Sequence, residues 1–267
     1  MTTDIVIIGS LGAMGREIAA CVLDEKDCRL AGCVECSGHP SMGRDYGECI
    51  GRGTLGIPLT DSPADLPVET SVVIDFSSPQ GTMAVLDSIK KRKTRIVIGT
   101  TGIAPEGVCR ITAASKIMPV VFSPNMSRGV NLLFVLTELA AQKLGPTFDI
   151  EIMEAHHRFK KDSPSGTAVR LGEIAASAIG MTYDDAVRNG RAGMVGARSN
   201  REVGMHAVRG GDIVGDHTVL FAGLGERLEL RHVANSKSTF ARGAVAAAQW
   251  LAMQKPGLYT MRDVLGL

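Results

Sequence analysis

Hydrophobic and polar positions divide the chain into two parts that are built differently. In the first, short runs rich in Val and Ile alternate with stretches whose apolar residues recur at helical spacing. Near-continuous apolar strands separated by helices are typical of a parallel sheet covered on both faces. The expected strands are 4–8, 29–35, 71–76, 95–99 and 119–122, and the expected helices are 12–23, 81–91 and 105–116. This part therefore predicts an α/β fold.

The second part has a more mixed character. Residues 148–152 alternate apolar and polar side chains, as a half-exposed strand does. Residues 216–222 and 227–233 predict two strands joined by the turn 223–226, which gives this part antiparallel character. We also expect a strand near 205–208 inside the Gly- and Arg-rich stretch 189–216, and helices at 130–144, 166–179 and 238–254. This part predicts a smaller α+β unit.

A glycine-rich turn follows the first strand and reads Gly9-Ser-Leu-Gly12-Ala-Met-Gly15. Such glycines let a pyrophosphate approach the backbone, and the next helix offers free N–H groups at its N-terminus. Glu35 follows about 20 residues later, where an acid can hold the ribose hydroxyls of a dinucleotide. Alone the pattern is weak, and an ordinary turn beside a surface glutamate is the alternative. Its place between a strand and a helix favours a dinucleotide site.

The residue after Glu35 bears on the choice between the two nicotinamide cofactors. It is Cys36 and not a basic residue, and no neighbouring Arg or Lys is evident to bind a 2′-phosphate. A carboxylate repels a phosphate dianion. We therefore expect NADH to be preferred over NADPH, with NADPH use possible.

Three more polar segments follow predicted strands. They are 75–79 (DFSSP), 99–102 (GTTG) and 123–127 (SPNMS). Each is explained equally well by ordinary turn chemistry. Ligands of open α/β sheets, however, bind at the carboxyl ends of the strands. Together these segments predict one ligand crevice.

The densest polar chemistry lies in residues 154–167, EAHHRFKKDSPSGT. Its adjacent histidines titrate near neutrality and can give or take a proton. Lys160 supplies a cation or a proton. Ser165 suits the N-cap of the next helix, where the N–H groups of Gly166 and Thr167 would be free to bind a carboxylate. The segment favours a small anionic substrate.

Two other interpretations of the polar residues remain open. Residues 154–167 could form a basic surface loop beside a capped helix. Adjacent histidines can also bind metal, but neighbouring strand residues point to opposite faces and no third ligand lies at the spacing that a metal site needs.

The pair Cys33 and Cys36, with His39, is a weak signal for redox or metal chemistry. We expect no metal.

Composition narrows the class of protein. A net charge of +1 and 4% aromatic residues argue against a nucleic-acid partner. No apolar run reaches the ~20 residues of a membrane span, and the first residues lack the features of a signal peptide. The six cysteines are then most simply reduced thiols. We expect a cytoplasmic protein without a membrane partner.

Seven motifs resemble the dihydrodipicolinate reductase family, also called the 4-hydroxy-tetrahydrodipicolinate reductase family. The signature HHxxK followed by SGT is highly specific to that family. The motifs, spread over nearly the whole chain, are GSLGAMGR (9–16), IDFSSPQGT (74–82), VIGTTG (97–102), SPNMSRGVN (123–131), EAHHRFKKDSPSGTA (154–168), VRGGDIVGDHTVLFAG (208–223) and FARGAVAAAQWL (240–251).

The resemblance implies a Rossmann-like dinucleotide-binding domain over 1–127, completed by 237–267. It implies a substrate-binding and oligomerisation domain over 128–236, whose mixed sheet builds a homotetramer. The implied activity is NAD(P)H-dependent reduction of 4-hydroxy-tetrahydrodipicolinate to tetrahydrodipicolinate with loss of water, on the diaminopimelate route to lysine. The partner is then a small anionic dicarboxylate.

The resemblance also implies residue roles. His156 would be the proton donor and acceptor and Lys160 a proton donor. The substrate would be bound by His157, Ser165, Gly166 and Thr167. The cofactor would be bound by Gly9, Ser10, Leu11, Gly12, Ala13, Met14, Glu35, Gly99, Thr100, Thr101, Ser123, Pro124, Asn125 and Met126.

This chain departs from the family pattern at the cofactor side. Many relatives carry Arg after the acid of the second strand and after the DF-S/T of the third, where this chain has Cys36 and Ser78. Both departures remove a cation and weaken the case for NADPH. Arg128 often corresponds to a smaller residue, and whether it compensates is open. An NAD-binding sensor without turnover, or a Rossmann oxidoreductase for a related amino or keto acid, are the competing functions.

Overall fold

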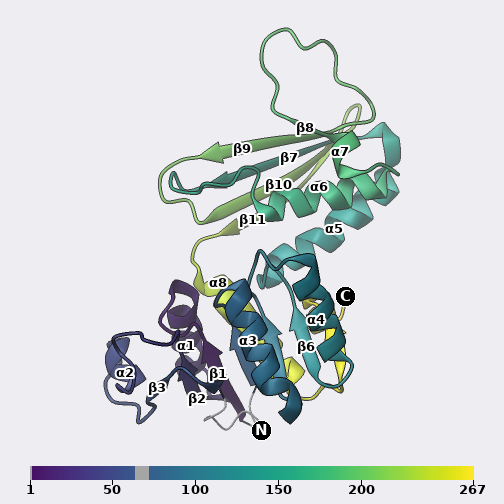
Figure 1. Cartoon of the computed structure of the whole chain (residues 1–267). Helices are drawn as coiled ribbons and strands as arrows, with labels where there is room; N and C mark the ends of the chain where they lie inside the picture. Colours follow the sequence, from purple (N-terminus) through teal and green to yellow (C-terminus); the bar gives the residue numbers. More distant parts are fainter. Residues whose placement is uncertain (1, 64–71) are drawn as a thin grey trace. The chain divides into compact units, whose positions relative to one another are not determined.

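The computed structural model describes residues 2–63 and 72–267. The chain divides into two compact units, Met1–Arg128 with Lys237–Leu267, and Gly129–Ser236 (Figure 1). The first unit is therefore built from two separate stretches of sequence, and the second is inserted between them.

The first unit contains a seven-stranded sheet in the order β12-β6-β5-β4-β1-β2-β3, with every neighbouring pair parallel. Its strands are β1 (Thr3–Ile8), β2 (Cys28–Val34), β3 (Leu59–Thr60), β4 (Val72–Asp75), β5 (Arg95–Ile98), β6 (Pro119–Phe122) and β12 (Gly257–Tyr259). The expected α/β fold is confirmed. Ser71, with which the third expected strand begins, lies outside the described residues.

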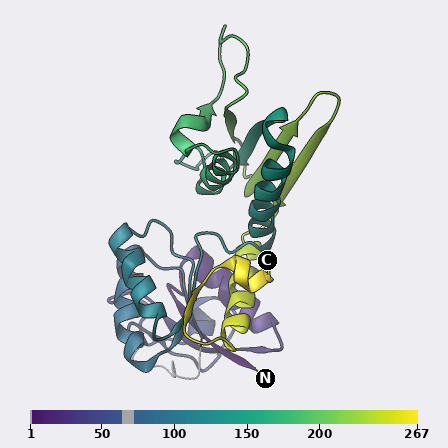
Figure 2. The same ribbon diagram turned by 90° about the vertical axis from the view of Figure 1, so that its right-hand side faces the viewer.

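Helices cover both faces of this sheet (Figure 2). On β1, Ile5 and Ile7 pack toward α1 (Ala13–Asp24) and α8 (Ser238–Leu251). Val6, between them, packs toward the other face, which is covered by the helices α3 (Pro79–Ile89) and α4 (Pro105–Ser115). Burial on both faces explains why the central strands have apolar residues at consecutive positions, such as 5–8 of β1 and 96–98 of β5. The short helices α2 (Tyr46–Cys49) and α9 (Met261–Leu265) complete the unit.

The second unit contains a five-stranded mixed sheet in the order β11-β10-β7-β9-β8. The strands are β7 (Asp149–His156), β8 (Val187–Asn189), β9 (Val203–Arg209), β10 (Gly215–Ala222) and β11 (Arg227–Ala234). β10 is antiparallel to β7 and β11, whereas β9 is parallel to β7 and β8. The mixed sheet is as expected. β7, however, runs four residues beyond the predicted end at 152.

Helices α5 (Arg128–Leu144) and α6 (Gly166–Ala178) pack on one face of this sheet, and the short helix α7 (Tyr183–Ala186) precedes β8. Ile150 and Ile152 of β7 point into this core and are at most 2% exposed. The opposite face carries Glu151 and Met153, and Met153 is 38% exposed. Because the alternation continues along β7, Glu154 lies on the buried face, two residues before the predicted catalytic histidine His156.

Candidate active site

The glycine turn after β1 is held rigidly by its surroundings. Gly9 has φ +70°, a conformation that favours glycine. A Cβ on Gly15 would overlap the Gly9 carbonyl, so turn and helix α1 pack too closely for any side chain there. Tyr46 donates its hydroxyl to Ser10 O at 2.7 Å, and Arg16 Nε donates to Leu11 O at 2.9 Å. The turn is preformed.

Glu35 lies directly after β2 and closes one side of the same turn. Its carboxylate accepts hydrogen bonds from the amides of Leu11 and Cys36, at 2.9 and 3.0 Å. A cavity of about 480 Å³ opens beside it, with Gly9 and Asp61 among its lining residues. The described lining residues include two acids and no Lys or Arg. The cavity thus combines glycine backbone without side chains, a carboxylate and enough volume. These features fit the adenosine half of a dinucleotide.

The other predicted cofactor segments follow β4, β5 and β6, which are consecutive in the sheet beside β1. Asp75 is buried at the end of β4, and burial raises the pKa of its carboxyl group. Its carbonyl accepts a hydrogen bond from Gly99 N at 2.9 Å. Ser123 Oγ donates to Asn125 O at 2.8 Å after β6. The segments therefore share one edge of the sheet.

The predicted cofactor residues differ in how far their side chains are exposed. Thr101 and Pro124 are exposed, whereas Ser10, Thr100 and Met126 are buried. Met126 belongs to the core on the α1 and α8 face. A buried side chain leaves mainly the backbone for a ligand, which is how glycine-rich turns bind phosphates.

In the second unit, His156 ends β7 beside a buried carboxylate. Nδ1 of His156 lies 2.6 Å from Oε2 of Glu154, whose side chain is 0% exposed. Arg209 of β9 forms two hydrogen bonds to the same carboxylate, both at 2.8 Å. The β7–β9 register pairs His156 with Arg209, which explains how residues far apart in sequence meet.

The same carboxylate reaches the start of α6. Oε1 of Glu154 accepts a hydrogen bond from the Ser165 amide at 3.0 Å. Ser165 Oγ accepts from Ala168 N at 3.3 Å, which confirms the predicted N-cap. The same hydroxyl lies 3.1 Å from Nε2 of His217 on β10. His156, His217 and the N-terminus of α6, where Gly166 and Thr167 lie, therefore form one cluster.

Burial and charge set the protonation states in this cluster. Burial raises the pKa of Glu154, but hydrogen bonds from Arg209, His156 and Ser165 outweigh it and hold the pKa below its usual value. Burial lowers the pKa of His156, and Glu154 opposes that effect only in part. Burial lowers the pKa of His217 to about 3. Glu154 is thus ionised and His217 neutral at pH 7.

The remaining predicted residues follow His156 along the chain. Nζ of Lys160 lies 2.9 Å from Oδ2 of Asp162, and the lysine side chain is 21% exposed. The His157 ring stacks obliquely near Phe159, with centroids 6.4 Å apart. Nδ1 of His157 is buried without a hydrogen-bond partner among the described residues. An unpaired buried nitrogen is a candidate contact for a ligand.

Three residues of the cluster were not among those predicted from the sequence: Glu154, Arg209 and His217. Glu154 carried a signal, because it is an acid at an inward-facing position of an alternating strand once β7 is extended. Arg209 and His217 carried none, because only the sheet register brings them to His156.

The described residues hold no group of three or more His, Cys, Asp or Glu side chains arranged to bind a metal ion. All six cysteines are free thiols. None of the described helices is both long and apolar enough to cross a membrane.

Comparison with known proteins covers both units. The family model "Dihydrodipicolinate reductase, N-terminus" matches residues 3–126, and "Dihydrodipicolinate reductase, C-terminus" matches residues 129–265. A 4-hydroxy-tetrahydrodipicolinate reductase of Hahella chejuensis is 46% identical over 265 residues, covering 99% of each chain. That of Geotalea uraniireducens is 45% identical over 263 residues, covering 98% of each.

Solved structures show the same fold. A dipicolinate-bound dihydrodipicolinate reductase from Paenisporosarcina sp. TG-14 matches with a TM-score of 0.78 and 24% identity, covering 98% of this chain and 99% of that one. An amine dehydrogenase from Mycobacterium smegmatis matches with a TM-score of 0.61 and 15% identity, covering 98% and 95%. Both units thus have the architecture of known proteins.

Proposed function

The chain belongs to the dihydrodipicolinate reductase family, and from that premise we propose that it reduces 4-hydroxy-tetrahydrodipicolinate to tetrahydrodipicolinate on the diaminopimelate route to lysine. One hydride and one proton are added to the substrate, and water leaves. The observation that carries the proposal is the cluster of His156, its buried carboxylate and the N-terminus of α6, inside a chain that its relatives match from end to end. The nicotinamide, when bound, supplies the hydride.

The residues of the second unit would divide the substrate chemistry among them. His156 gives the proton that accompanies the hydride, because an imidazole can give or take a proton in the physiological range. Lys160 is a second proton donor and a cation that can bind a carboxylate. Its ammonium group, which contacts Asp162 here, would contact a substrate carboxylate instead. The amides of Gly166 and Thr167 at the start of α6, with Ser165 and His157, bind the second carboxylate. Two anion sites match a dicarboxylate.

The cavity beside Glu35 supports a preference for NADH. Its two acids, Glu35 and Asp61, would repel a 2′-phosphate, and its described lining offers no cation to offset them. Cys36 and Ser78 line the same cavity. By the family resemblance, these are the positions at which many relatives carry Arg. We therefore infer that NADPH binds more weakly than NADH.

A homotetramer in the cytoplasm is the assembly and compartment that we infer. The support lies in the uncovered face of the mixed sheet. On that face Met153, Val208 and Val233 are 38%, 55% and 42% exposed. Apolar side chains exposed on one face of a sheet favour association with a second copy. Light scattering of the purified protein should give the mass of four chains.

A coupled assay tests the proposal. The substrate is generated enzymatically, and the decline of NADH absorbance is followed with purified protein. We expect turnover that depends on both substrate and protein, and a higher kcat/KM with NADH than with NADPH. A clear NADPH preference would contradict the cofactor assignment alone, and no oxidation of either cofactor would contradict the reaction.

A further inference from the structure

Glu154 neither binds the substrate nor gives the proton in the proposed function, although its side chain is 0% exposed and contacts His156. We propose that Glu154 is the positioning residue of this site: its one buried carboxylate orients the imidazole of His156 and the first turn of α6 together. The inference rests on the proposed function, because His156 and α6 are the groups proposed to act on the substrate.

The partners of Glu154 fix where the protons are. Two nitrogens of Arg209 and the amide of Ser165 contact its oxygens, and these groups can only donate. An ionised carboxylate can only accept. The remaining contact, between Oε2 and Nδ1 of His156, is therefore donated by the histidine. Nδ1 keeps its proton, so the proton that His156 gains and loses is on Nε2.

Nε2 is the other nitrogen of the ring, and the His156 side chain is 12% exposed. Nε2 lies beside Gly215 of β10, where a Cβ would come within 3.0 Å of it. His217, two residues along the same strand, packs edge-on against the ring with centroids 5.2 Å apart. The imidazole is thus held at Nδ1 and on one side, while glycine leaves Nε2 free of a neighbouring side chain at that position.

The charges that face His156 come from several elements. Glu154 lies on β7, Arg209 on β9, His217 on β10, and Lys160 in the loop after β7. Burial lowers the pKa of His156 most, Glu154 raises it, and the two cations Lys160 and Arg209 lower it by smaller amounts. Neutral His217 adds no charge. Removing the carboxylate should therefore lower the pKa of His156 further and leave less of it protonated at pH 7.

Glu154→Gln removes this charge with almost no change of shape. One glutamine carbonyl can accept from His156 or from Ser165, and its NH₂ group then faces donors on the other side. We expect the NMR titration midpoint of the His156 ring in the ligand-free protein to fall by about one pH unit or more. The pH above which kcat/KM declines should fall by the same amount. Above that pH, kcat/KM of the variant should therefore be about tenfold lower than that of the unsubstituted protein.

Glu151→Gln is the matched control. Glu151 lies on the same strand and also binds arginines and a histidine, but on the opposite face. Its substitution should leave the His156 titration and the kcat/KM profile unchanged. If Glu154→Gln folds poorly because Arg209 loses its partner, Arg209→Met with Glu154→Gln removes both charges, and the His156 midpoint should still fall.

The outcomes separate this inference from the proposed function. His156→Gln serves both to assign the His156 resonance and to measure its share of turnover. Loss of turnover in His156→Gln, together with an unmoved His156 titration and pH profile in Glu154→Gln, would overturn the role of Glu154 alone. Wild-type turnover in His156→Gln would contradict the proposed function instead, and the NMR midpoint would still decide whether Glu154 sets the state of His156.

Discussion

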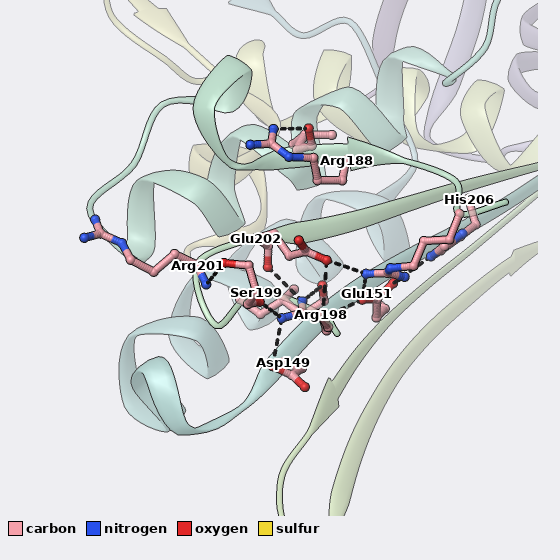
Figure 3. Close-up of polar contacts among 11 residues, drawn as sticks. Asp149, Glu151, Arg188, Arg198, Ser199, Arg201, Glu202 and His206 are labelled. Atoms are coloured by element: carbon pink, nitrogen blue, oxygen red, sulfur yellow. Dashed lines mark hydrogen bonds and ion pairs between the residues drawn. The ribbon is translucent and has the colours of Figure 1, made fainter. Parts of the chain in front are cut away.

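Two carboxylates on one strand meet the same kinds of partner and do different things. Glu154 accepts hydrogen bonds from Arg209 and His156 on the covered face of β7. Glu151 accepts them from Arg191, Arg198 and His206 on the open face. Figure 3 shows Glu151 with Arg198 and His206. The residue types therefore do not distinguish a site from a structural contact.

The inner cluster, Glu154 with Arg209 and His156, and the outer cluster, Glu151 with Arg191, Arg198 and His206, differ in burial and in the elements that they contact. Glu154 is 0% exposed and touches the N-terminus of α6, whereas Glu151 is 15% exposed. Arg198 also bonds the backbone at Ile150 and Glu202, so the outer cluster ties the stretch between β8 and β9 to β7. Burial of Glu151 raises its pKa, but its three partners outweigh this and lower the pKa to about 2. The outer cluster joins a loop to the sheet, whereas the inner one holds the imidazole that is proposed to give the proton.

Removing the arginine of the inner cluster should have the largest effect on stability. Arg209→Met leaves the Glu154 carboxylate buried without its main partner, which costs about 3 kcal/mol in the free energy of unfolding. Chemical denaturation measures the loss. Adding Glu154→Gln should recover most of it, because no bare charge remains. A double variant as unstable as Arg209→Met would mean that shape, and not charge, explains the effect.

The two clusters should also titrate in different pH windows. The pKa of His217 is lowered by burial, so the unfolded chain takes up protons below about pH 6.5 and the folded chain does not. Stability should fall as pH drops below 6.5, by at most about 1.4 kcal/mol per pH unit for this one group. Glu151 loses its contribution only below its unfolded value of about 4.5. Stability that stays flat from pH 6.5 to 5 would contradict the buried, neutral His217, and His217→Gln should reduce the slope.

The smallest effect is expected at the outer cluster. Arg191 is 33% exposed, and Glu151 keeps two other partners without it. Arg191→Met should cost only about 0.5 kcal/mol and leave kcat unchanged. Steady-state kinetics and the same denaturation series measure both. A loss comparable to that of Arg209→Met would remove the distinction between the two faces.

The sequence predicted most of the first unit, because strands buried on both faces and amphipathic helices leave clear periodic patterns. It did not reveal β3, β8 or β12, which have only two or three residues and too few positions for a pattern. The four-residue helices α2 and α7 were not predicted, for the same reason. β7 was predicted too short, because Glu154 breaks the apolar alternation.

The site was predictable only where its chemistry is local in sequence. Ser165 at the start of α6 and the glycine turn are short-range signals, and both were placed correctly on their elements. Arg209 comes 55 residues after Glu154 and reaches it only through the β7–β9 pairing. A single sequence contains no sign of that register. The contacts of Glu154, Arg209 and His217 around His156 are therefore visible only in the folded chain.

The account depends most on His156 as the group that gives the proton. The direct measurement is kcat of His156→Gln with enzymatically generated substrate and saturating NADH, beside NADH binding to the same variant. We predict that kcat falls at least about 100-fold, the contribution typical of a general acid, while the NADH dissociation constant is unchanged. A kcat within about twofold of the unsubstituted protein would contradict the account.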